Sequence, residues 1–142
     1  MNEEELRQMM ATMEYYRAQL EGLAEQQQII QLSLEENIRA RETLKQYQSA
    51  GDGSEILVPV GGSSFVHAKV ASSEKVLVGL GSGVTVEKSA EEAQDIVEVR
   101  ISELAETVKK ISERRGFLEA EHAKLNQQFQ EAYQKLQQGP KG

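Results

Sequence analysis

Residues 55–88 read EILVPVGGSSFVHAKVASSEKVLVGLGSGVTVEK, and this segment differs in composition from the chain on either side of it. The wider middle region, 51–88, holds seven of the eleven glycines and one of the two prolines. Its apolar runs are rich in Val, Ile, Leu and Phe, which are typical of β-strands. They predict four short strands, at Glu55–Val60, Phe65–Val70, Lys75–Leu80 and Val84–Lys88.

Two glycine-containing triplets separate paired strands and predict tight hairpin turns. Gly61-Gly62-Ser63 and Gly81-Ser82-Gly83 supply residues that can take the positive φ such turns need. Pro59 has no N–H to donate, so its strand is expected at a sheet edge. We therefore expect two β-hairpins in tandem, linked near residues 71–74.

Two hairpins bury little apolar surface alone, and exposed strand edges pair readily with other chains. The run 56–60 is apolar on both faces, so both faces are expected to be covered. The strands are therefore expected to complete a sheet or barrel with neighbouring subunits, whose number the strand chemistry leaves open. The side chains expected to form this platform are Ile56, Leu57, Val58, Val60, Phe65, Val66, Val76, Leu77, Val78, Val84 and Val86.

The segments on either side, 1–50 and 89–138, have the pattern of coiled-coil helices. Alternate steps of three and four from Leu6 to Leu44 meet an apolar residue at nine of twelve positions, and the same steps from Val97 to Leu136 do so at ten of twelve. Asn2 with Glu5, and Ser89 with Glu92, have capping-box spacing where the helices are expected to begin. The tail, 139–142, contains Pro140 and is a poor continuation for a helix.

Two helices with one narrow apolar seam each are stable mainly when the seams meet. An antiparallel coiled coil within the chain pairs residues whose numbers sum to about 141, a register that a 3.5-residue repeat maintains. It places Gln27 near Arg115, and Leu20 near His122. The expected fold class is α+β and mostly α: a long antiparallel coiled-coil hairpin with two central β-hairpins that join an intersubunit β-barrel.

Composition excludes several classes of protein. The net charge of -7 disfavours non-specific binding to nucleic acid and to anionic membranes, since both need basic side chains. The chain has no cysteine, so disulfides and thiolate metal sites are excluded. No apolar leader opens the sequence and no run approaches the roughly 20 residues of a membrane span, so a cytoplasmic location is expected.

The order helix, two hairpins, helix resembles the alpha class of prefoldin subunits. The specific part of the resemblance is the middle segment: residues 56–66 are similar to that family's first hairpin, and residues 75–88 to its second. The resemblance implies a cytosolic hetero-hexamer of two alpha and four beta subunits, with coiled coils extending from a β-barrel platform. It also implies an ATP-independent chaperone that holds unfolded proteins and passes them to a group II chaperonin.

In an antiparallel arm both chain ends lie at the same tip. The residues expected to bind unfolded clients there are Leu6, Met9, Met10, Met13, Phe129, Tyr133 and Leu136. Methionine adapts to many apolar shapes, and Met10 and Tyr133 lie off the strict seam. The alternative is that these residues only fill the heptad at a frayed end.

Several features of the sequence allow more than one interpretation. Gly22 and Gly116 either form a flexible point or are tolerated surface glycines. The main rival function is a structural coiled-coil tether or scaffold with the hairpins as an oligomerisation cap, followed by an RNA-binding arm. An enzyme is the weakest option, because no nucleophile–base pair, phosphate loop or metal-ligand cluster is visible; neither a cofactor nor a metal is expected.

Overall fold

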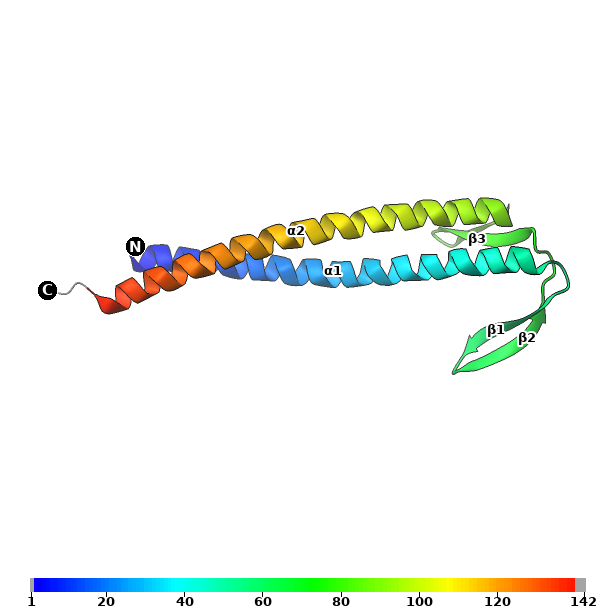
Figure 1. The fold of residues 1–142 in the computed structure, drawn as a ribbon, viewed down its shortest axis with the longest axis horizontal. Helices are drawn as coiled ribbons and strands as arrows, with labels where there is room; N and C mark the ends of the chain where they lie inside the picture. Colours follow the sequence, from blue (N-terminus) through cyan, green and yellow to red (C-terminus); the bar gives the residue numbers. More distant parts are fainter. Residues whose placement is uncertain (1, 140–142) are drawn as a thin grey trace. The chain divides into compact units, whose positions relative to one another are not determined.

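The computed structural model describes residues 2–139. Along the chain, two long helices are separated by four strands: α1 (Glu3–Ala50), β1 (Glu55–Gly61), β2 (Ser64–Lys69), β3 (Lys75–Gly81), β4 (Val84–Ser89) and α2 (Ala90–Gln138). Figure 1 shows the two helices and labels β1, β2 and β3. The predicted fold class, mostly α with two β-hairpins, is confirmed. Strand bounds differ from the predicted ones by about one residue.

Side-chain caps form at both helix starts, and the cap of α1 is a reciprocal capping box. The Glu5 N–H donates to Asn2 Oδ1 at 2.8 Å, and the Asn2 N–H donates to Glu5 Oε2 at 3.2 Å. At α2, the Glu92 N–H donates to Ser89 Oγ at 3.0 Å, and that hydroxyl donates to the Glu92 carboxylate at 3.1 Å. The bonds that backbone N–H groups donate satisfy donors that a helix start leaves without an intrahelical partner.

The described residues form two compact units. The terminal unit consists of 2–32 with 106–139, and the central unit consists of 33–105. In the terminal unit, the Arg115 guanidinium donates a hydrogen bond to the Gln27 side chain, as the predicted register requires. In the central unit, Arg41 pairs with Glu98 at 3.3 Å, and the Gln94 amide donates to Gln48 Oε1 at 2.8 Å. Residue numbers rise along α1 as they fall along α2, so the helices run antiparallel within the central unit.

The central unit contains two separate two-stranded antiparallel sheets. Val58 pairs with Val66 in the first hairpin, and Val78 pairs with Val86 in the second. The turn residues Gly62 and Ser63 have φ of 58° and 59°, which is the left-handed pattern that matches the twist of a hairpin. The second turn is equivalent, with Ser82 at 52° and Gly83 at 77°. The glycine triplets therefore serve as predicted, with serine as an additional left-handed residue in each turn.

Hydrogen bonds tie the loops of the central unit together around Asp52. The Ser73 N–H donates to Asp52 Oδ1 at 2.6 Å, and the Tyr47 hydroxyl donates to the Ser72 carbonyl at 2.8 Å. Donation by the Ser73 backbone and hydroxyl holds the pKa of the Asp52 carboxyl below its ordinary value. These contacts connect the end of α1 to the link between the two hairpins.

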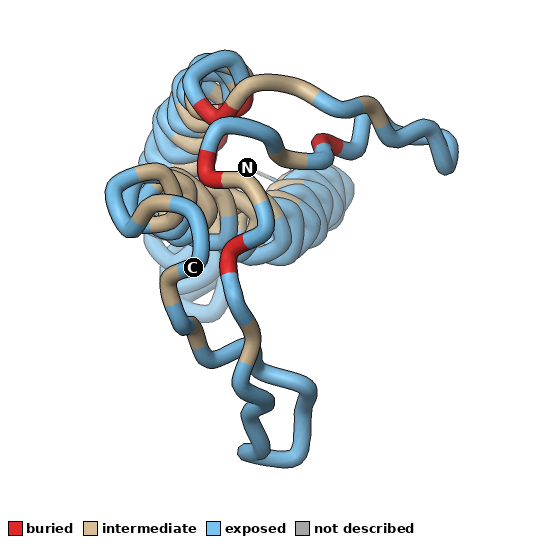
Figure 2. Tube along the Cα trace, turned by 90° about the vertical axis from the view of Figure 1, so that its right-hand side faces the viewer, coloured by how far each residue is buried: buried red, intermediate tan, exposed pale blue. Residues whose placement is uncertain are grey.

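The core is narrow in both units. Buried apolar side chains in the terminal unit are Leu6, Ile111 and Leu118; those in the central unit are Val70, Val78, Ala90, Ala93 and Val97. Figure 2 shows how few positions along the trace are buried, with most of the helix surface exposed or half-buried. Most apolar side chains of the hairpins are therefore left in contact with solvent in a single chain.

Candidate functional site

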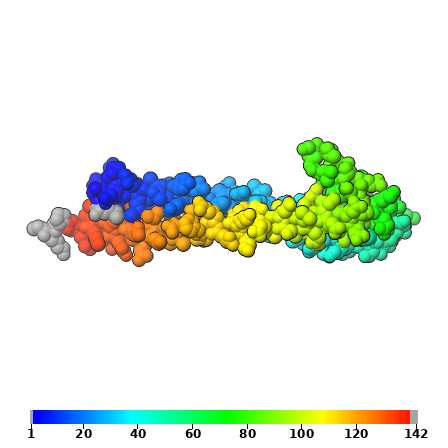
Figure 3. All heavy atoms as spheres, turned by 90° about the horizontal axis from the view of Figure 1, so that it is seen from above, coloured from blue at the N-terminus to red at the C-terminus, as the bar shows by residue number. Residues whose placement is uncertain are grey.

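A groove lies between the first turns of α1 and the last turns of α2, inside the terminal unit. It has a volume of about 290 Å³. Figure 3 shows the first part of α1 beside the last part of α2. The lining residues are Glu3, Leu6, Arg7 and Met10 from α1, and Phe129, Tyr133 and Leu136 from α2.

Helical spacing explains how these side chains converge. Leu6 and Met10 are four residues apart on α1, and Phe129 and Tyr133 are four apart on α2, so each pair lies on one helix face. The two aromatic rings are nearly parallel, with centroids 5.9 Å apart and an interplanar angle of 16°. Gln137 Nε2 donates to the Tyr133 hydroxyl at 2.9 Å, which restrains that ring. The α2 side of the groove is thus a pre-formed aromatic wall.

The groove has a buried floor and exposed walls. Leu6 is only 6% exposed, whereas Met10 is 54% and Tyr133 is 46% exposed. A flexible thioether beside a flat aromatic face can contact apolar side chains of many shapes. The arrangement is therefore suited to weak binding of varied apolar groups, and not to recognition of one defined ligand.

Charges stand at the α1 side of the groove. Glu3 and Arg7 both line it. Glu3 belongs to the acidic first turn of α1, where negative charges interact favourably with the positive end of the helix dipole. Sequence reasoning did not select these two residues for the site. The available signal was their spacing, because Glu3, Arg7 and Met10 recur at intervals of four and three on one face of α1.

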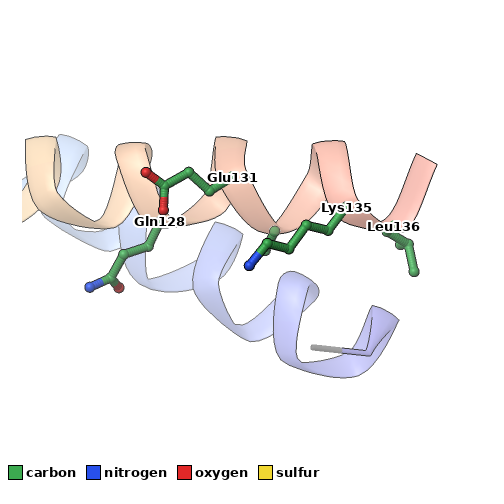
Figure 4. A pocket seen from close by; sticks show the side chains of 5 residues that line it. Gln128, Glu131, Lys135 and Leu136 are labelled. Carbon is green, nitrogen blue, oxygen red and sulfur yellow. The ribbon is translucent and has the colours of Figure 1, made fainter. Parts of the chain in front are cut away.

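A second groove, of about 440 Å³, lies along the end of α2 and has a lining of mixed polar and apolar side chains. Figure 4 shows Gln128, Glu131, Lys135 and Leu136 around it, and Ala132 completes the lining. Lys135 and Tyr133 are two residues apart, so they project about 200° apart around the helix. Leu136 alone is shared with the apolar groove. The other apolar residues of the first groove, Leu6, Met10, Phe129 and Tyr133, do not line the second.

The structure brings together five of the seven predicted tip residues: Leu6, Met10, Phe129, Tyr133 and Leu136. Met9 and Met13 do not line the groove and are half-buried at seam positions. The two residues that lie off the strict seam, Met10 and Tyr133, form its exposed walls.

The predicted platform residues differ between the two hairpins. In the first hairpin, Leu57 and Phe65 are 59% and 60% exposed on one face, and Val58 and Val66 are 37% and 47% exposed on the other. Cross-strand pairing places Val58 opposite Val66, and Leu57 lies on the same face as Phe65. Both faces of this hairpin are thus uncovered and apolar.

One face of the second hairpin is covered by its own chain. Val78 is only 8% exposed, while Leu77 on the other face is 73% exposed. The Arg100 guanidinium, from α2, donates to the Gly79 carbonyl at 2.7 Å and holds the strand in place. Of the remaining predicted platform residues, two are exposed, Val60 and Val84. Three are half-buried: Ile56, Val76 and Val86.

Within 2–139, no three or more His, Cys, Asp or Glu side chains are grouped so as to hold a metal ion. No helix in the same range has both the length and the apolar character needed to cross a bilayer.

The fold and groove define a class of proteins in which two coiled-coil helices flank a pair of β-hairpins. The family model for prefoldin subunits matches residues 16–135, and the chain belongs to the prefoldin family. The matched range contains all four strands, Phe129 and Tyr133, and it begins after Leu6 and Met10. Membership of this family supports a chaperone-type role.

Relatives in sequence are prefoldin alpha subunits. The chain is 36% identical over 110 residues to "Prefoldin subunit alpha" of Methanothrix thermoacetophila, covering 78% of this chain and 72% of that protein. It is 33% identical over 135 residues to the subunit of the same name from Methanocorpusculum labreanum, covering 95% and 92%.

Solved structures agree on the fold. A chain in the cryo-EM structure of filamentous PFD from Methanocaldococcus jannaschii has a TM-score of 0.68 and 29% identity, covering 81% of this chain and 95% of that one. The prefoldin beta subunit from Thermococcus strain KS-1 has a TM-score of 0.61 at 20% identity, covering 90% and 91%, and this likeness concerns the fold alone.

Proposed function

We propose that the chain is the alpha-type subunit of an ATP-independent holding chaperone, which binds unfolded proteins in the groove between the helix ends. The observation that carries this proposal is the exposed apolar wall of Met10 and Tyr133 above a buried floor. An unfolded chain presents apolar side chains of many shapes, and this groove can accept them without a defined fit.

A single groove would hold a client weakly, and this weakness suits a holding role. Burying one Met or Leu side chain contributes about 1.5–3 kcal/mol. Several grooves on one assembly raise the effective concentration of the second and later contacts, so the whole complex binds far more tightly than one subunit. Holding and release then require no nucleotide.

The middle segment, 51–88, would be the oligomerisation platform, with 1–50 and 89–138 as the coiled-coil segments. Of the predicted tail, 139–142, residues 140–142 lie outside the described residues. The proposed partners are prefoldin beta subunits, in a hetero-hexamer of two alpha and four beta chains. Support comes from the first hairpin, whose two uncovered apolar faces and free edges are suited to strand pairing with neighbours. Delivery of clients to a group II chaperonin, in the cytoplasm, rests on the family resemblance.

The test compares wild-type and groove variants after assembly with a beta-type subunit. A Met10→Glu and Tyr133→Glu double variant should suppress aggregation of a diluted, denatured client less well than wild type. Its affinity at each altered groove should fall about tenfold or more, because two apolar contacts are lost and charges are introduced. Light scattering without nucleotide measures the effect, and native mass spectrometry checks that the hexamer persists.

The matched control is Gln128→Glu with Gln127→Glu, which adds the same charge to exposed polar positions of α2. This control should suppress aggregation as wild type does. Equal suppression by the groove variant would refute binding in the apolar groove. A wild-type assembly that has no effect on any client would favour the tether or scaffold instead.

A further inference from the structure

An apolar stripe lies on the outer face of α1 in the terminal unit, away from both the seam and the groove. Its members, which we call the outer stripe, are Ala11, Tyr15, Ala18, Gly22, Ile29 and Leu32, all exposed to solvent. They follow one another at steps of three and four residues, with Glu25 at the remaining position of the series. Each lies two residues beyond a seam residue, about 200° around the helix, so the stripe faces away from α2.

The exposure of the large members is high. Tyr15 is 59%, Ile29 68% and Leu32 60% exposed. An outer coiled-coil position normally carries a charged or polar side chain, because nothing covers it. Three large apolar side chains on one exposed face therefore suggest an interaction surface.

The equivalent face of α2 provides an internal comparison. Its eight positions from 106 to 131 carry five charged residues and one Gln, and Phe117 is the only large apolar residue among them. Phe117 packs against the Arg114 guanidinium, 5.7 Å from the ring centroid, so its own helix supplies a partner. Tyr15 likewise has a partner on its own helix, because its ring centroid lies 6.1 Å from that of Tyr16. The two faces therefore differ in composition: that of α2 carries one large apolar residue and five charges, whereas that of α1 over 11–32 carries three large apolar residues and one charge, Glu25.

The spacing and the charges around the stripe indicate what would cover it. Three-and-four spacing over 22 residues, about 33 Å, matches the apolar face of another helix. Glu14 and Glu21 border one edge of the stripe, and Glu14 also pairs with Arg17 at 3.2 Å. The other edge carries the uncharged Thr12, Gln19 and Gln26. Added Cβ atoms at Gly22 would meet no other atom within 4 Å, so a partner can approach the backbone there.

We propose that the outer stripe docks an amphipathic helix of a partner protein, whose apolar face is bordered by Lys or Arg on the side that meets Glu14 and Glu21. A second copy of this chain fits less well, because it would bring a second acidic edge to the same surface. The site is distinct from the client groove and does not depend on its function.

The probe is a synthetic helical peptide of about three heptads, with Leu along one face and Lys along one edge of that face. A second peptide carries Glu in place of Lys. Fluorescence anisotropy with the full chain at low salt should give an affinity about tenfold higher for the Lys peptide. Ile29→Glu with Leu32→Glu should lower that affinity about tenfold or more, and Glu14→Gln with Glu21→Gln should remove the preference between the peptides.

Two control variants locate the site. Peptide affinity should be unchanged in Phe117→Glu on α2, and also in the groove variant, Met10→Glu with Tyr133→Glu. Circular dichroism should show that every variant keeps its helices. Three results would overturn the proposal: unchanged affinity in the stripe variant, loss of affinity in the groove variant, which would make the peptide a client, or stripe-dependent self-association in sedimentation equilibrium.

Discussion

At the scale of single residues, Asp52 illustrates how one exposed carboxylate can organise a junction. Its Oδ1 accepts a hydrogen bond from the Ser73 N–H at 2.6 Å. Next to it in the chain, the Gly53 N–H donates a hydrogen bond to the Val70 carbonyl at 2.8 Å. Ser73, the residue that donates to Asp52, is only 6% exposed. A buried polar residue needs partners, and here Asp52 is one of them.

Replacement of Asp52 by Asn should lower the midpoint of urea unfolding at neutral pH. The carboxyl pKa lies below its ordinary value of 3.8 in the folded chain, because Ser73 donates to the charged form. The carboxylate therefore stabilises the fold above pH 3.8, and this contribution is lost as pH falls through the lower, folded-state pKa. Midpoints of wild type and variant, measured from pH 7 downward, should converge in acid.

The control for this experiment is Glu36→Gln, a neutralisation at an exposed position of α1. It should shift the midpoint little at any pH. A constant difference between Asp52→Asn and wild type across the whole range would contradict a role for the charge.

The methionines show where reasoning from single residues reaches its limit. Met9, Met10 and Met13 have the same chemistry, and their positions near the start of the chain place all three near the tip. In the structure, Met9 and Met13 are half-buried at the seam, and Met10 is exposed in the groove. Which methionine is free depends on the rotation of α1 about its axis, so position relative to the heptad was the informative signal.

At the scale of elements, the helices and strands were predictable because each has a strong local signal. Capping pairs fixed the starts of both helices, and glycine triplets fixed both hairpin turns. The unequal covering of the hairpins was not predictable. It depends on a contact between Arg100 and Gly79, which are 21 residues apart and share no local pattern.

Gly22 and Gly116 lie within helices, and replacing each by alanine tests what they do there. No neighbouring atom lies within 4 Å of a Cβ added at Gly22 or Gly116, so alanine fits at both positions without strain. Each Gly→Ala change should raise the free energy of unfolding by about 1 kcal/mol, because alanine restricts the unfolded chain more and favours the helix. Urea denaturation measures this gain.

The same variants separate the two interpretations of these glycines. Tolerated surface glycines predict that client holding stays at the wild-type level after both substitutions. A flexible point predicts that the stabilised double variant holds clients less well. A loss of stability in either variant would contradict the open surroundings of the two positions.

At the scale of the whole molecule, exposed apolar surface is the feature that most needs an explanation. Leu57, Phe65 and Leu77 in the hairpins are each more than half exposed, whereas the buried core of each unit is small. A chain with so little core gains stability chiefly by binding partners that cover such surface. Assembly and stability should therefore be linked.

Replacement of both Leu57 and Phe65 by Glu should abolish assembly with a beta-type subunit while leaving the helices folded. Loss of each side chain removes about 1.5–3 kcal/mol of favourable burial free energy, and each new carboxylate would have to lose its water in the interface.

In wild type, the thermal midpoint should rise as beta subunit is added, since binding favours the folded state. Native mass spectrometry and thermal unfolding measure the two effects, with Thr43→Glu plus Gln46→Glu on exposed α1 positions as the control. A double hairpin variant that still forms the hexamer, with the same rise in midpoint, would show that this face of the first hairpin stays open to solvent after assembly.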